Sequence, residues 1–168
     1  MTESLYPRVQ DLAIPADLDY RFVPPFLYRD NYHVDVAGNR DGRARVLAAR
    51  HRLNGPVANI DADWGGHLDL IGGVHTLYGL LPPATYFADH PAWYSEINGQ
   101  RQERDAQLCW TNHEMVAELT ENVLVKLRQA PTPRLISVSI NDNDNYCLCA
   151  ACRAVNQANG SPAGTVVA

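Results

Sequence analysis

Two groups of residues that could do chemistry follow one another between positions 141 and 152. Five short polar side chains, Asn141-Asp142-Asn143-Asp144-Asn145, come directly after an alternating apolar run. Cysteine then recurs as Cys147-x-Cys149-x-x-Cys152, and Cys109 is the fourth cysteine. Carboxylates can protonate a glycosidic oxygen or bind sugar hydroxyls, whereas clustered thiolates bind soft metals. The sequence therefore predicts two candidate sites that are neighbours along the chain.

The four cysteines suit a structural zinc ion. Three of them lie within six residues of one another, a grouping that fits a metal better than a disulfide framework. A site of four thiolates is closed, so it would pin a loop and leave no position for water. The Cys-x-Cys spacing is tighter than the usual Cys-x-x-Cys, and a disulfide or free, half-buried thiols are the alternatives.

Asp142 is the candidate catalytic acid, or a carboxylate that binds sugar hydroxyls, because it follows the end of a predicted strand. Asn141 and Asp144 are candidate substrate contacts beside it. The alternative is that these residues only form a turn, through bonds from their side chains to the backbone.

Three further residues fall near predicted strand ends and are candidate substrate contacts. His75 could donate to a sugar hydroxyl, Tyr78 could stack on a ring, and Arg29 could pair with a carboxylate such as that of a uronic acid. A structural hydrogen-bonding role is the alternative for His75, which follows two glycines.

Composition limits the classes of partner. The chain has 168 residues, enough for one domain with a core, and a net charge of -5 with no basic stripe, which argues against nucleic acid. Its apolar runs are far shorter than the ~20 residues of a membrane span. No signal peptide is recognisable, localisation stays open, and no organic cofactor is expected.

Periodicity predicts alternating helices and strands. Residues 1–25, with four prolines, are expected to be an extended lead-in. Amphipathic spacing predicts helices at 43–53 and 111–129, the second with a capping box of Thr111 and Glu114. Asn98-Gly99 predicts the tip of a hairpin. Four segments are predicted as strands: 26–29, 71–78, 106–110 and 135–140.

The last two of these strands flank the longer helix, and this order predicts a parallel pair with a right-handed crossover. In such a pair the ends of the strands are adjacent, so Cys109 and Cys147 are expected to lie close together.

Longer motifs carry a family resemblance. They are Leu80-Leu81-Pro82-Pro83-x-x-Tyr86-Phe87-x-x-His90-Pro91-x-Trp93-Tyr94, Asn98-Gly99-x-Arg101, Gln107-Leu108-Cys109-x-Thr111-Asn112 and Ser137-Val138-Ser139-x-Asn141-Asp142 with Tyr146-Cys147-x-Cys149-x-x-Cys152. Over roughly residues 26–165 the chain resembles a bacterial family known as domain of unknown function 4838, found in large proteins similar to glycoside hydrolases.

The resemblance implies an α/β fold of the (β/α)8 type. Because a complete barrel needs about 250 residues, residues 26–168 are expected to be its first half, with parallel strands, crossover helices and the remainder missing from this chain. At longer range the chain is similar to hexosaminidase-type barrels, whose fourth strand ends in an acidic pair. Asn141-Asp142 supplies one carboxylate there.

The leading expectation is thus a carbohydrate-active protein resembling glycoside hydrolases, which acts on a poly- or oligosaccharide at the carboxyl ends of the barrel strands through Asp142. A second hypothesis is a non-catalytic carbohydrate-binding module with a zinc-pinned cysteine loop, which uses His75, Tyr78 and Asn141 as contacts. A third is a small zinc-stabilised interaction domain.

Overall fold

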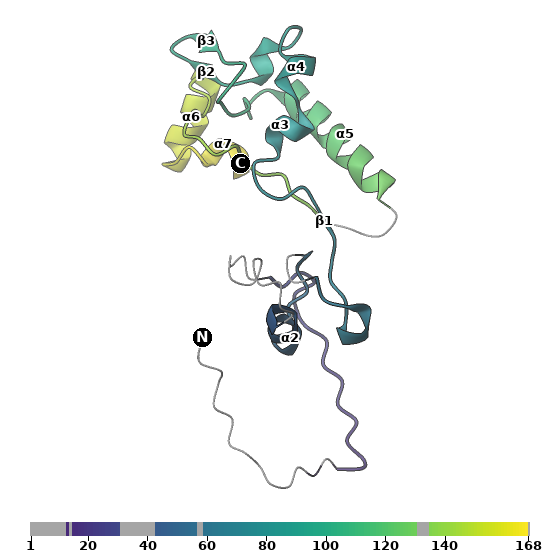
Figure 1. The fold of residues 1–168 in the computed structure, drawn as a ribbon. Coiled ribbons are helices and arrows are strands. Elements are labelled where there is room, and N and C mark those ends of the chain that lie inside the picture. The colour runs from purple at the N-terminus through teal and green to yellow at the C-terminus, as the bar shows by residue number, and fades with distance from the viewer. Residues whose placement is uncertain (1–12, 14, 31–42, 57–58, 131–134, 168) are drawn as a thin grey trace.

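The computed structural model describes residues 13, 15–30, 43–56, 59–130 and 135–167. In Figure 1 the helix α2 (Arg43–Arg50) lies in a lower part of the molecule, and the chain runs through β1 (Leu70–Ile71) into an upper part that holds the later elements. The short helix η2 (Ala62–Trp64) precedes β1 and lies in the lower part. The later elements are α3 (Leu77–Leu80), α4 (Pro83–Tyr86), η3 (Pro91–Trp93), β2 (Glu96–Ile97), β3 (Gln100–Arg101), α5 (His113–Gln129), β4 (Leu135–Ile136), α6 (Ala150–Asn159) and α7 (Gly164–Val167).

The lower part has little regular structure. Residues 15–25 contain no helix or strand, and most of residues 1–14 lie outside the described part of the chain, so the lead-in at 1–25 stays a prediction. The strand predicted at 26–29 is wrong, because that segment bonds to a loop instead: Asn54 exchanges backbone and side-chain hydrogen bonds with Arg29. Ala48 of α2 and Ile60 form a small buried cluster there.

The main core lies where α5 packs over α3 and the segment that follows η3 (Figure 1). The apolar positions of α5 recur at helical spacing, and Met115 and Leu119 are buried. They contact a set of apolar side chains from the other elements: Leu77, Leu80, Leu81, Trp93, Tyr94 and Leu108. Each such side chain, when fully buried, contributes roughly 1.5–3 kcal/mol.

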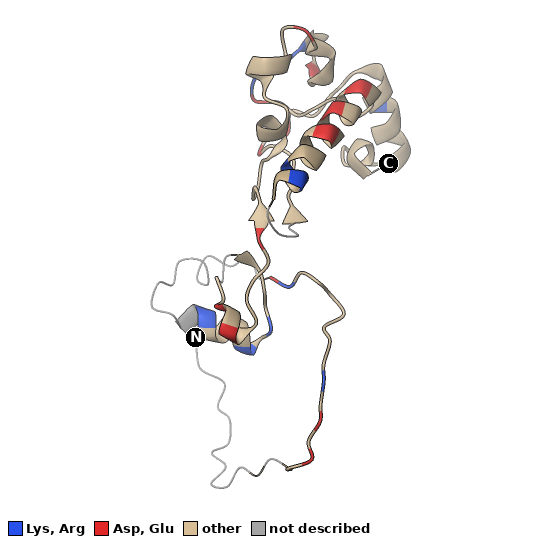
Figure 2. Ribbon diagram, turned by 90° about the vertical axis from the view of Figure 1, so that its right-hand side faces the viewer, with Lys and Arg blue, Asp and Glu red and all other residues tan. Residues whose placement is uncertain are grey.

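The ends of α5 are stabilised in two ways. Figure 2 shows acidic residues along its first turns and basic residues near its end, an order that complements the helix dipole. Its cap is Asn112, whose side chain accepts a hydrogen bond from the Met115 amide at 3.0 Å. The predicted Thr111 cap is wrong, because the Thr111 hydroxyl faces the cysteines.

The hairpin predicted at Asn98-Gly99 is confirmed. Strands β2 and β3 pair antiparallel, and φ is +52° at Asn98 and +75° at Gly99. Positive φ at both central residues is the geometry that a two-residue hairpin turn needs, and Asn-Gly adopts it at low cost.

The parallel pairing differs from the prediction. Strand β4 pairs in parallel with β1, Leu70 opposite Leu135, whereas Leu108 forms an antiparallel bridge with Tyr94. The expected pair between 106–110 and 135–140 is therefore wrong, although a long crossover that includes α5 does join the two parallel strands.

Both parallel strands are two residues long, because side chains beyond them capture the backbone. The Ser139 amide donates to the Thr76 hydroxyl at 2.9 Å, and the Thr76 amide donates to the Ser139 carbonyl at 3.0 Å. The strand predicted at 71–78 is likewise wrong after Ile71, since α3 begins at Leu77. A parallel pair of strands joined by a helical crossover is the unit that a (β/α)8 barrel repeats, and the partial barrel stays a prediction.

Candidate metal centre and ligand loop

All four cysteines converge. The Sγ atoms of Cys109, Cys147, Cys149 and Cys152 lie within 4.8 Å of one another. Cys109 Sγ is 3.8 Å from the sulfurs of both Cys149 and Cys152. Cys109, Cys147 and Cys152 are buried, Cys149 is partly exposed, and all four are free thiols.

Local structure brings these sulfurs together from two parts of the chain. Cys109 follows the bridge between Tyr94 and Leu108, and its amide donates to the Trp93 carbonyl at 2.8 Å. Cys149 is the residue that precedes α6, and Cys152 lies in the first turn of that helix. The expected proximity of Cys109 and Cys147 is therefore found, but an irregular segment produces it rather than a pair of parallel strands.

Two of the separations between the sulfurs equal those around a tetrahedral metal. A zinc–sulfur bond of about 2.3 Å puts neighbouring sulfurs of a regular tetrahedron about 3.8 Å apart. The two Cys109 distances equal that value, and they are far longer than the ~2.05 Å of a disulfide. Four thiolate ligands with no open position make a structural site and not a hydrolytic one.

Hydrogen-bonding groups surround the sulfurs. The Thr111 hydroxyl lies 3.2 Å from Cys152 Sγ, and the Glu96 amide donates to Cys147 Sγ at 3.3 Å. Arg101 places a guanidinium nitrogen 3.7 Å from the same Cys147 sulfur. Hydrogen bonds of this kind stabilise metal-bound thiolates, and mutation of such outer partners weakens metal binding.

The thiol pKa values are shifted in opposite directions. A hydrogen bond with Cys147 lowers the pKa of Cys109 to about 4, and bonds from Arg101 and Thr111 act in the same direction. That hydrogen bond raises the pKa of Cys147, and burial raises it further. Burial also raises the pKa of Cys152. A metal ion that binds must displace the protons that remain, so its affinity increases with pH.

Asp142 and His75 come together at the surface. Asp142 Oδ2 lies 3.9 Å from His75 Nε2, and the two side chains are 90% and 47% exposed. His75 Nδ1 lies 3.1 Å from the Ile140 carbonyl, which holds the ring against the loop. His75 also has φ of +58°, an uncommon value for a residue with a side chain.

The neighbouring loop residues divide into structural and exposed. Asn141 is tied to the segment before Cys109, since its Nδ2 donates to the Ala106 carbonyl at 2.7 Å. Asp144 is exposed, and its carbonyl accepts from the Tyr146 amide in a tight turn. We name residues 141–145 the ligand loop. Within it, Asp142 and Asp144 are the acidic side chains that face solvent.

Two predicted contacts lie away from the ligand loop. The Arg29 guanidinium donates to the carbonyls of Arg52 at 2.7 Å and Phe26 at 2.6 Å, so it holds the lower part together. Tyr78 packs edge-on against Tyr94, with ring centroids 6.0 Å apart. Burial raises the pKa of Tyr78, whose hydroxyl is enclosed while the residue as a whole is half-buried, and its stacking role stays a prediction.

Gln107 has a role that its sequence pattern did not reveal. It is 4% exposed, and its side-chain amide donates to the carbonyls of Asn141 and Asn143 while its Oε1 accepts from the Asn141 amide. Gln107 belongs to one of the motifs that carry the family resemblance. Its place in that motif was the sequence signal that could have identified it. Arg101 and Thr111, which contact the cysteines, belong to those motifs too.

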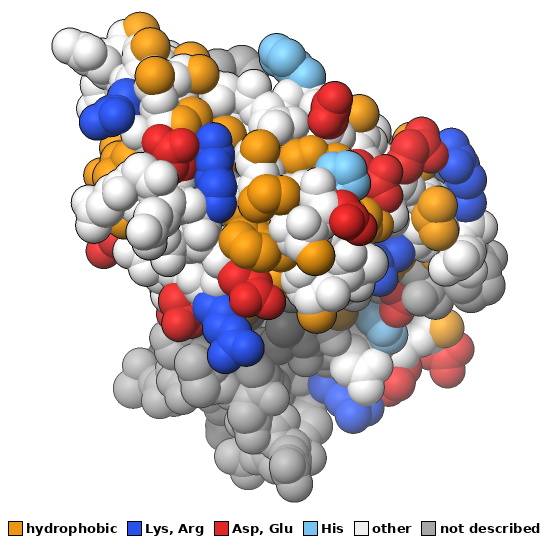
Figure 3. Space-filling view, turned by 90° about the horizontal axis from the view of Figure 1, so that it is seen from above, with side chains coloured by type: hydrophobic (Ala, Val, Ile, Leu, Met, Phe, Trp, Pro, Cys, Tyr) orange, Lys and Arg blue, Asp and Glu red, His pale blue; other side chains and the backbone are white. Residues whose placement is uncertain are grey.

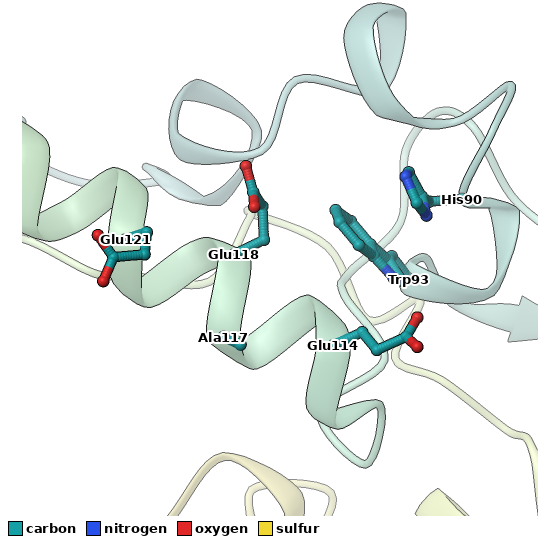
Figure 4. Close-up of a pocket in the computed structure, with 6 residues that line it drawn as sticks. All are labelled: His90, Trp93, Glu114, Ala117, Glu118 and Glu121. Atoms are coloured by element: carbon teal, nitrogen blue, oxygen red, sulfur yellow. The ribbon is translucent and has the colours of Figure 1, made fainter.

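A hollow of about 550 Å³ lies elsewhere, between η3 and α5, and Figure 4 shows three glutamates along α5, of which Glu114 points toward Trp93 and Glu121 points away from it. Its lining is His90, Trp93, Glu114, Ala117, Glu118 and Glu121. The His90 and Trp93 rings stack 4.0 Å apart, and Glu118 accepts a hydrogen bond from the Tyr86 hydroxyl. No sequence-predicted site residue lines this hollow. The glutamates' spacing along one helix face was its only sequence signal.

The molecular surface in Figure 3 shows Lys and Arg side chains scattered among acidic and apolar ones on the upper face. Among the described residues, no helix is long and apolar enough to cross a membrane.

Comparisons with known proteins complete the description. No curated protein matches the chain, and no solved structure matches it. A family model matches over residues 1–168, and it is described as domain of unknown function (DUF4838). Because the match spans the whole chain, this protein belongs to the family of the domain of unknown function DUF4838.

Proposed function

We propose that this chain is a carbohydrate-binding segment whose ligand loop is held in place by a structural zinc ion on Cys109, Cys147, Cys149 and Cys152. The observation that carries the proposal is the convergence of the four sulfurs within 4.8 Å of one another, with two of the separations at 3.8 Å. Zinc fits better than harder cations because all four donors are sulfur, and a structural role follows from the closed set of ligands.

Support for a sugar as the ligand comes from the ligand loop and from the expectation that the family occurs in large proteins similar to glycoside hydrolases. Asp142 presents a solvated carboxylate, and His75 beside it offers a ring nitrogen. Together they provide an acceptor and a donor for adjacent hydroxyl groups, which is the pattern that a polyol needs. In a barrel, the segment after a strand is also where substrates bind, and the ligand loop follows β4.

Binding is favoured over hydrolysis by the surroundings of Asp142. A general acid in a glycosidase is desolvated and works with a second carboxylate. The Asp142 side chain is 90% exposed, and the ionisable group that it contacts is a histidine. A glycoside hydrolase in which Asp142 is the acid remains the second candidate, because the pairing with His75 could fix the orientation of the carboxyl group.

Metal content tests the first half of the proposal. Elemental analysis of the purified chain should give one zinc per molecule, with four thiols that react with a thiol reagent only after chelation. Four freely reactive thiols in a metal-free protein would refute the zinc centre.

A glycan array with Asp142→Asn tests the second half. Asp89→Asn is the matched control, because Asp89 is another exposed carboxylate remote in sequence from the ligand loop. We expect the Asp142 variant to lose binding and the Asp89 variant to keep it. If Asp142→Asn abolishes hydrolysis of a bound glycan and leaves binding intact, the hydrolase is correct. If neither variant nor the parent binds any glycan, the carbohydrate proposal fails.

A further inference from the structure

Gln107 connects the ligand loop with the segment that carries Cys109. Its Nε2 donates to the Asn141 carbonyl at 2.8 Å, to the Asn143 carbonyl at 2.9 Å and to Asn143 Oδ1 at 3.0 Å. Its Oε1 accepts from the Asn141 amide at 2.9 Å. A carboxamide is the side chain of this length that donates and accepts at once, so neither a glutamate nor a methionine can replace these bonds.

The backbone of Gln107 extends the same connection. Its amide donates to the Asn145 carbonyl at 3.1 Å, and its carbonyl accepts from the Ser95 amide and hydroxyl, both at 3.0 Å. The ligand loop is thus bonded to Gln107 at its beginning, middle and end. Among the described residues whose side chains bond to this loop, Gln107 is the buried one.

Each of the two segments that this connection joins carries a proposed metal ligand two residues further along the chain. Cys109 follows Gln107 by two positions, and Cys147 follows Asn145 by two positions. A metal ion that holds Cys109 and Cys147 on one centre also fixes the distance between Gln107 and the end of the ligand loop. Without the metal, that distance is maintained by hydrogen bonds alone, each worth about 1 kcal/mol net.

We propose that Gln107 is a positioning residue that transmits metal binding to the ligand loop, so that residues 141–145 are ordered when the cysteines hold a metal and loosen when they do not. The proposal rests on the zinc centre proposed above and deepens it, because it makes presentation of Asp142 depend on metal occupancy. Gln107 acts through the loop backbone and need not touch the ligand.

Backbone hydrogen exchange measured by NMR on the full chain tests this without any sugar. The probe is the Asn141 amide, which donates to Gln107 Oε1, and the internal reference is the Leu119 amide in the middle of α5. In the zinc-loaded parent both amides should exchange slowly. Chelation should accelerate Asn141 about 10- to 100-fold, the range expected when a buried hydrogen bond opens, and should leave Leu119 unchanged.

Two variants separate Gln107 from general loosening. Gln107→Met keeps the volume and removes every side-chain bond, and Gln100→Met is the control at an exposed position of β3. The Gln107 variant should retain one zinc and four protected thiols, yet exchange at Asn141 as fast as the chelated parent, with little further change on chelation. The Gln100 variant should behave like the parent.

Slow exchange at Asn141 in zinc-loaded Gln107→Met, or no acceleration in the chelated parent, would overturn the coupling. If Gln107→Met does not fold, as fast exchange at Leu119 would reveal, the chelation of the parent still decides. Zinc content is measured separately in every sample. A parent protein that binds no zinc therefore refutes the metal centre itself. A zinc-loaded parent in which chelation does not change exchange at the Asn141 amide refutes only the coupling.

Discussion

Replacement of Arg101 by methionine should weaken zinc binding without removing a ligand. The Arg101 guanidinium lies 3.7 Å from Cys147 Sγ and 3.4 Å from the Glu96 carboxylate. Two unit charges 3.7 Å apart interact by about 4 kcal/mol at an effective dielectric constant of 20. A zinc ion with four thiolates carries a net charge of about -2, or about half a charge per sulfur, which halves the attraction to about 2 kcal/mol.

The expected loss of zinc affinity is therefore about tenfold to thirtyfold, within the range typical of outer-shell partners of metal ligands. Competition with a chromophoric zinc chelator at fixed ionic strength measures it. Arg104→Met is the matched control, because Arg104 is exposed and lies three residues further along the chain.

A double variant separates charge from structure, since Arg101 also donates to the Tyr94 carbonyl at 2.9 Å. Glu96→Gln combined with Arg101→Met lacks the same backbone bond but removes the carboxylate that the single variant leaves unpaired near the thiolates. It should regain part of the lost affinity. Equal affinities of the Arg101 and Arg104 variants, or a double variant as weak as the single one, would refute the electrostatic argument.

Three further predictions concern the fold around the site. Met115→Ala should lower the free energy of unfolding by about 2–5 kcal/mol in urea titrations, because Met115 is fully buried, whereas Val125→Ala on the same helix, 41% exposed, should change it by less than about 0.5 kcal/mol. Asn112→Ala should lower the free energy of unfolding by about 1 kcal/mol, because it removes the cap of α5. Thr111→Ala should mainly weaken zinc binding, and the reverse result would favour a Thr111 cap. Burial raises the pKa of Tyr94 above its ordinary value of 10.0, so the stability that its neutral form contributes is present below pH 10 and decreases as pH rises beyond it; Tyr94→Phe should flatten this alkaline decline in denaturation curves.

Local signals predicted the elements whose physics is local. The α5 helix follows from its 3.6-residue apolar period, and the hairpin tip follows from the backbone freedom of Asn98-Gly99. The cap of α5 was placed one residue too early, because Thr111 and Asn112 are both good caps and the cysteine sulfurs attract the threonine hydroxyl.

Strands were overpredicted because pairing is not a local property. The alternation at 135–140 is real, but Ser137 and Ser139 bond to Thr76 instead of extending a ladder, and β4 ends at Ile136. The partner of β4 is β1, more than sixty residues earlier, and nothing in the composition of either segment specifies the other. The convergence of the cysteines was predicted from that incorrect pairing, so their proximity was predicted correctly for a partly wrong reason.

Gln107 shows why a candidate site is only partly visible in a sequence. The acidic ligand loop was recognisable, because short polar residues after a strand must turn. Its buried support was not, because a glutamine between apolar residues has no distinctive pattern and its partners lie 34 to 36 residues away.

The shortness of the strands explains what a metal would contribute here. Each strand among the described residues has two residues, too few for a ladder to align the segments that carry the site. The segment at 106–110 is instead held by the bridge at Leu108 and by hydrogen bonds from the backbone amides of Gln107 and Cys109. Four bonds to one metal ion would cross-link that segment to the start of α6 with a precision that isolated hydrogen bonds do not give. If the cysteines hold a metal, a closed metal site and a solvent-facing carboxylate would complement each other, since the metal would supply the rigidity that the short strands lack and the carboxylate would need that rigidity to select a ligand.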